Sequence, residues 1–259
     1  MTHDEYIHYA DQYVDGAQKI SIRSTTPVIE KDTYSLNLEH SFGNYDLYFN
    51  PEGELLYSVH FENTKFRIVY GYDNKGKLVS SMQVKLHTGE LMELSTFDYD
   101  GDGRLIFERC RENDFDLGFE NSEDRIHKYY DNTEEIVTLC QIEPDATHVE
   151  IVTYDEESGL VTDRTITSDD KLVIRVTHEY GDESVIRRIY SCKSEEPYEV
   201  SEYIRGEHGF VSECRCDSEG TSYVTQYAFT FDEKGEWTSR VSLEDGEPKH
   251  SVDRKIEYY

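Results

Sequence analysis

The stretch Asp98-Tyr-Asp-Gly-Asp-Gly103 offers the most suggestive chemistry in this sequence of 259 residues. Its carboxylates alternate at Asp98, Asp100 and Asp102, and glycine stands at the sixth position, as at the start of a calcium-binding loop. The twelfth position of such a loop needs a glutamate, but this chain has Arg109 there. The ligand set is therefore incomplete, so we expect a hairpin turn and no metal, with these three aspartates as the calcium alternative.

A second candidate is the acidic segment at residues 111–125, RENDFDLGFENSEDR. Apolar side chains inside a rim of carboxylates suit the binding of a basic protein. The alternative is a decorated turn whose phenylalanines fold back onto the sheet. The predicted partner-binding residues are Glu112, Asp114, Phe115, Asp116, Phe119, Glu120, Glu123 and Asp124.

Catalytic and cofactor motifs are missing from the sequence. It contains no HExxH, no GxSxG, no phosphate-binding loop and no dinucleotide fingerprint, and its ten histidines are scattered. The five cysteines form no CxxC pair, so neither a disulfide framework nor a zinc site is indicated. We therefore expect no enzyme activity and no cofactor. Exposed tyrosines could stack on sugars, but cross-strand pairing explains them better.

The charge balance excludes two classes of partner. With 55 acidic and 26 basic residues, the formal charge is −29, which disfavours nucleic acid and anionic membrane surfaces. A basic protein is the natural counterpart of such a field, and solubility alone is the simpler explanation. The first residues lack a basic start and an apolar core, so no signal peptide is indicated. The sequence as given thus predicts a cytoplasmic protein, although a chain that had lost its leader would look the same.

Most of the chain repeats one unit. An aromatic residue precedes Asp or Asn, then a glycine follows, then an apolar residue, as in Tyr72-Asp-Asn-Lys-Gly-Lys-Leu78. Asn50 and Asp232, the first and last such positions, are 182 residues apart over seven intervals, which gives a mean spacing of 26 residues. Alternating strands flank each turn, so each unit predicts a β-hairpin. Four units depart from the pattern: one has Glu134 where glycine is expected, another has an extra residue before Gly159, and the copies at Tyr180-Gly181 and Ile204-Arg205 are poor.

The expected fold is therefore all-β. Antiparallel hairpins of about 26 residues should form a twisted or coiled meander of about eight units, which we assign to a single domain at residues 20–259. Residues 1–19 form a separate element in this interpretation. Thr2 and Glu5 resemble a capping box, and apolar residues at helical spacing predict an amphipathic helix that ends near Gly16.

The repeated phrase resembles the YD repeat of bacterial Rhs-like proteins over roughly residues 45–259. This resemblance implies stacked β-hairpins. In large family members the hairpins form a shell around a toxin, but this chain has too few units for a shell, so the cage function is not carried over.

Together these features predict a non-enzymatic scaffold that binds a basic protein. A specific form is an immunity or inhibitor protein that neutralises a basic toxin or nuclease. Two alternatives stay open: a surface or periplasmic carbohydrate-binding module, and an enzyme with an unrecognised cleft. The sequence leaves the oligomeric state unknown.

Overall fold

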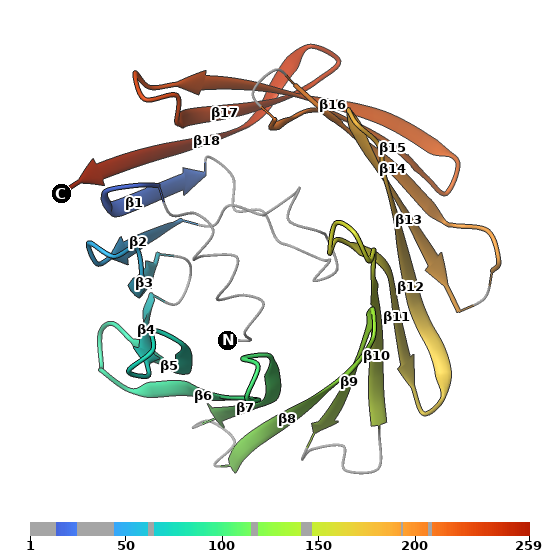
Figure 1. Cartoon of the computed structure of the whole chain (residues 1–259). Coiled ribbons are helices and arrows are strands. Elements are labelled where there is room, and N and C mark those ends of the chain that lie inside the picture. Colours follow the sequence, from blue (N-terminus) through green and yellow to red (C-terminus); the bar gives the residue numbers. More distant parts are fainter. Residues whose placement is uncertain are drawn as a thin grey trace. The chain divides into compact units, whose positions relative to one another are not determined.

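The protein is described from a computed structural model (Figure 1). The structure describes residues 14–24, 44–61, 65–114, 119–140, 147–192, 194–206 and 209–259. These residues form eighteen β-strands and, within the described part of the chain, no helix. The described residues therefore include no helix of the length and hydropathy needed to cross a membrane.

Most of the strands after β2 are separated by short turns, as the repeat predicts. They are β1 (Ala17–Ser24), β2 (Tyr45–Phe49), β3 (Leu55–His60), β4 (Phe66–Tyr72), β5 (Leu78–Lys85), β6 (Leu91–Tyr99), β7 (Leu105–Asp114), β8 (Phe119–Tyr130), β9 (Thr133–Cys140), β10 (Thr147–Tyr154), β11 (Val161–Ser168), β12 (Lys171–Tyr180), β13 (Ser184–Ser191), β14 (Glu199–Arg205), β15 (Val211–Ser218), β16 (Thr221–Phe231), β17 (Trp237–Glu244) and β18 (Glu247–Tyr258). The all-β repeat fold is thus confirmed.

The hydrogen-bonding order of the sheet corrects the expected coiled meander. Each strand from β2 to β17 pairs with the next strand along the chain. β1 then pairs antiparallel with β2 on one side and with β18 on the other. Among the described strands the order consequently closes on itself and leaves no free edge to continue a coil, because β1 satisfies the backbone groups that the first and last hairpins would otherwise expose.

The prediction of an N-terminal helix is also wrong where the structure describes it. Residues 1–13 lie outside the described part, but Val14 is not helical and Gly16 (φ 73°) leads directly into β1. Ala17 and Ile20 are both buried although they are three residues apart, because the strand has a bulge between Ala17 and Lys19. Ala17 belongs to a strand and not to a helix because the backbone here pairs with β18, where Tyr258 is opposite Ala17.

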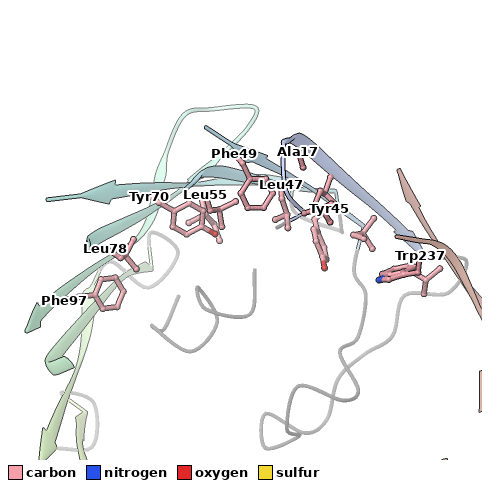
Figure 2. Close-up of a cluster of buried hydrophobic side chains, with 14 of the residues drawn as sticks. Ala17, Tyr45, Leu47, Phe49, Leu55, Tyr70, Leu78, Phe97 and Trp237 are labelled. Carbon is pink, nitrogen blue, oxygen red and sulfur yellow. The ribbon is translucent and has the colours of Figure 1, made fainter. Parts of the chain in front are cut away.

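The chain divides into two compact units. Unit 1 comprises Met1–Asp124, Phe229–Arg240 and His250–Tyr259, and unit 2 comprises Arg125–Ala228 and Val241–Lys249. The largest apolar core belongs to unit 1, where alternate residues of neighbouring strands lie on the same face. Figure 2 shows this cluster, in which Leu47, Phe49 and Leu55 are almost fully buried.

The clean copies of the repeat form one kind of turn, and all of them belong to unit 1. In the copy that begins at Asp73, Oδ1 of Asp73 accepts hydrogen bonds from the amides of Lys75 (2.8 Å) and Lys77 (2.9 Å). The fourth residue, Gly76, has φ +79°, a region that favours glycine. The copies at Asn50, Asp100 and Asp232 repeat this geometry. The repeated Asp or Asn is therefore a turn-forming residue.

Candidate functional site

The calcium candidates occupy one of these turns. Oδ1 of Asp100 accepts hydrogen bonds from the amides of Asp102 (3.0 Å) and Arg104 (2.8 Å), and Oδ2 accepts one from Nε of Arg104 (2.8 Å). The amide of Arg104 is the main cause that holds the pKa of Asp100 below its usual value. Asp102 points into solvent, with 84% of its side chain exposed, and Asp98 is exposed on β6. The oxygens of Asp100 thus serve the hairpin.

The acidic segment at residues 111–125 lies mostly in strands. Glu112 is exposed near the end of β7, while Glu123 and Asp124 are half-buried on β8. Arg109 donates to both carboxylate oxygens of Asp124, each at 2.7 Å. Among the other predicted partner-binding residues, Asp114 belongs to β7 and Phe119 and Glu120 belong to β8, whereas Phe115 and Asp116 lie outside the described residues.

One group of side chains near this segment has the geometry of a metal site. Ligand atoms of Glu93, Cys110 and Glu112 lie within 4.8 Å of one another on neighbouring strands of unit 1. Ser95 orients the first of them by donating to Oε1 of Glu93 at 3.1 Å. Burial raises the pKa of the Cys110 thiol, so this group favours the protonated form, which is not the form that binds metals.

A shallow depression in unit 2 combines acidic and aromatic groups. It has a volume of about 340 Å³ and lies at two neighbouring hairpin turns, β8–β9 and β10–β11. The amide of Tyr154 donates to the carbonyl of Asn132 at 2.8 Å and so joins the two turns. The lining residues are Asp131, Asn132, Tyr154, Asp155, Glu156 and Gly159, which include no cation.

Two exposed side chains with apolar surface are adjacent in sequence to residues that line this depression. Tyr130 is 54% exposed and precedes Asp131, while Leu160 is 43% exposed and follows Gly159. Apolar contact surface beside carboxylates is the combination that a site for a cationic protein segment needs. We call the six lining residues with Tyr130 and Leu160 the acidic depression.

The carboxylate of Asp155 is fixed by its own turn. Its Oδ1 accepts hydrogen bonds from the amides of Ser158 (2.8 Å) and Glu157 (3.2 Å). The Ser158 amide is the largest cause that lowers the pKa of Asp155, so this carboxylate stays charged into mildly acidic solution. One side of the depression is therefore permanently anionic near neutral pH.

A buried network begins at the wall of the depression. The hydroxyl of Tyr154 donates to Oε2 of Glu134 at 2.7 Å, and Nδ1 of His127 lies 2.7 Å from Oε1 of the same carboxylate. Burial alone would raise the pKa of Glu134, but the hydrogen bonds from His127 and Tyr154 hold it below the usual value. The network thus anchors Tyr154 to the interior of unit 2.

The sequence did not single out the acidic depression, although it contains the signal for it. Glu134 stands where the repeat predicts glycine, and the extra residue before Gly159 enlarges the β10–β11 turn. Both departures from the repeat border the same depression in the structure. The spacing of the hairpins explains this convergence, because turns two strands apart lie at the same edge of the sheet.

Comparisons with known proteins give similarities of fold alone. No family model matches the chain, and no curated protein matches its sequence. A porin-like protein from Bacteroides uniformis ATCC 8492 is similar, with a TM-score of 0.48 and 14% identity over 95% of this chain and 98% of that chain. For a porin-like protein from Bacteroides vulgatus ATCC 8482, the TM-score is 0.39 and the identity 8% over 94% of this chain and 98% of that chain.

A third similar structure is TcdB2-TccC3-Cdc42. Its TM-score is 0.31 and its identity 9%, over 80% of this chain and 16% of that chain. These similarities assign neither a family nor an activity to the chain.

Proposed function

We propose that the protein is a non-enzymatic scaffold that binds a basic protein through the acidic depression of unit 2. The main observation behind this proposal is the composition of the lining: Asp131, Asp155 and Glu156 line the depression together with Tyr154, and no lining residue is a cation. A lysine or arginine side chain of the partner would meet these carboxylates, and its apolar neighbours would cover Tyr130 and Leu160.

The turns at Asp73 and Asp100 in unit 1 differ from those of the acidic depression, because they contain basic residues. The turn at Asp100 contains Arg104, which forms an ion pair with Asp100 at 2.8 Å. Lys77, in the turn at Asp73, lies 4.7 Å from the ring centre of Tyr99. The turns that line the acidic depression have the sequences Asp131-Asn132 and DEESGL at residues 155–160, which contain no basic residue. Their negative charge is available to a partner from outside the chain.

We also propose two finer statements. The first is that the chain is a short relative of the YD-repeat proteins, which the shared turn geometry at Asn50, Asp73, Asp100 and Asp232 supports. The second is that the partner is a basic toxin or nuclease in the cytoplasm, which this chain masks as an immunity or inhibitor protein. The formal charge of −29 supports the second statement, because such a field steers cationic partners.

The test is affinity capture with charge-matched variants. The double variant Asp131→Asn, Glu156→Gln removes two charges from the depression, and asparagine tolerates the φ of 43° at residue 131. The control Glu52→Gln, Asp102→Asn removes the same charge from exposed turn residues of unit 1.

We expect the wild type and the control to retain the same cationic protein at physiological salt, and the depression variant to bind it about tenfold more weakly. Equal weakening in both variants would show that the total charge, not the depression, binds the partner. Capture of no protein, together with binding to a glycan array, would favour the carbohydrate-binding alternative.

A further inference from the structure

His178 is a buried imidazole whose nitrogens have no hydrogen-bond partner among the described residues. It lies on β12 of unit 2 with 7% of its surface exposed, and neither Nδ1 nor Nε2 is bonded. A buried polar group without a partner is unfavourable, so such groups usually meet water or a ligand. The ring therefore marks a place where a small polar molecule is expected.

Two guanidinium groups share the face of His178. Arg187 on β13 is directly opposite His178 in the register of the sheet. Arg164 on β11 is opposite Val176, two residues before His178, and therefore points to the same side of the sheet. Burial, and then the charges of Arg187 and Arg164, lower the pKa of His178 to about 4. The ring is thus neutral at pH 7 between two cations.

Both guanidiniums already contact carboxylates, one of which, Glu150, is shared with Arg125, whose Nη2 lies 3.8 Å from Oε2 of Glu150. Nε of Arg164 lies 2.5 Å from Oε1 of Glu150 on β10. Nη2 of Arg187 donates to Oε1 of Glu199 on β14 at 2.7 Å. The ring of Tyr180, on the same strand as His178, is 6.2 Å away, and Asp163 lies on the opposite face of the sheet, where it binds Arg175. A proton added to His178 would bring a further positive charge to this face, and a bound anion would offset it.

We propose that His178, Arg164 and Arg187 form a binding site for a small oxyanion, a carboxylate or a phosphate, that binds together with one proton. A neutral imidazole offers one donor and one acceptor, and its acceptor nitrogen cannot bond to an oxyanion. The imidazolium offers two N–H donors, so protonation converts the ring into a partner for two oxygens. The anion neutralises the added charge, and the guanidiniums of Arg164 and Arg187 strengthen its binding. This site is separate from the acidic depression and does not depend on its function.

Histidine titration by NMR tests the proposal in the intact protein. The pKa of His178 is measured in chloride, acetate and phosphate at equal ionic strength, with His178→Phe to assign the signal. The internal control is His60 of unit 1. Burial lowers the pKa of His60 to about 4 as well, but this ring has a partner, because its Nε2 lies 3.0 Å from Oγ of Ser58.

We expect acetate or phosphate to raise the pKa of His178 by roughly one unit or more, while that of His60 stays unchanged. A shift in acetate alone assigns a carboxylate ligand, and a shift in phosphate alone assigns a phosphate. The variant Arg187→Lys should reduce the shift, since lysine presents a single point charge in place of a planar fork. If His178 titrates identically in all three salts, the ring is satisfied by water and the proposal is wrong.

Discussion

The hydroxyl of Tyr154 donates a hydrogen bond of 2.7 Å to Oε2 of Glu134, and this contact links the acidic depression to the interior of unit 2. Glu134 is 7% exposed and accepts from His127 on its other oxygen. A buried carboxylate with donors on both oxygens is held in one position. The wall of the depression is therefore rigid at Tyr154, which favours binding without reorganisation.

Tyr154→Phe removes one donor from the buried carboxylate of Glu134. We expect a loss of about 1–2 kcal/mol in the free energy of unfolding, measured by urea denaturation at pH 7, because Oε2 is left without this partner. The loss should shrink on acidification: the native pKa of Glu134 lies below its unfolded value, so the contribution of the Tyr154 donor is present above the unfolded value and disappears as the pH falls. Tyr130→Phe, at an exposed tyrosine, is the control, and equal losses in both variants would contradict this role.

The turn at Asp73 makes a prediction about the repeat. Asp73→Ala removes the acceptor of the Lys75 and Lys77 amides and should lower the free energy of unfolding. Asp73→Asn keeps an acceptor oxygen and should lose less than half as much. Thermal or urea unfolding distinguishes the two variants. An equal loss would mean that the negative charge, rather than the acceptor geometry, stabilises the turn.

Burial of His60 predicts acid sensitivity in unit 1. Burial lowers the pKa of His60 to about 4, whereas an unfolded histidine titrates near 6.5. Between these values the unfolded chain binds the extra proton, so the contribution of His60 is complete above pH ~6.5 and falls by roughly 1.4 kcal/mol per pH unit down to pH ~4.

His60→Phe should reduce this slope while keeping contact with Phe66, whose ring is stacked on the imidazole at 4.5 Å. The free energy of unfolding, measured at pH intervals from about 4 to 8, gives both slopes. Identical slopes in the wild type and the variant would place the acid sensitivity elsewhere.

The sequence predicts the hairpins well because each turn is encoded locally. Asp73 and Gly76 determine one turn through contacts with residues four or fewer positions away, and such contacts can be read from a short phrase. Closure of the sheet depends on pairs such as Ile22 with Arg254, which lie more than two hundred residues apart, and no local pattern specifies them. The pairing of Ala17 with Tyr258 of β18, which makes the chain a strand from this residue onward, is invisible to a local pattern for the same reason.

The candidate site shows a similar limit. The sequence located unusual chemistry at residues 111–125, where Arg109 already binds Asp124 across the strand pair. It did not predict the acidic depression, because the relation between Asp131 and Glu156 exists only when two hairpins lie side by side. His178 was equally hidden among ten histidines, since its environment comes from Arg164 and Arg187 on neighbouring strands.

The most direct test of the central claim is NMR mapping of a cationic probe on the intact protein. The probe is a capped peptide that alternates arginine and leucine, titrated at physiological salt. We predict that the amide shifts concentrate at Asp131, Tyr154 and Gly159 and vanish in the Asp131→Asn, Glu156→Gln variant. Shifts distributed evenly over the acidic turns of both units, or unchanged in that variant, would contradict the claim that the acidic depression recognises a basic partner.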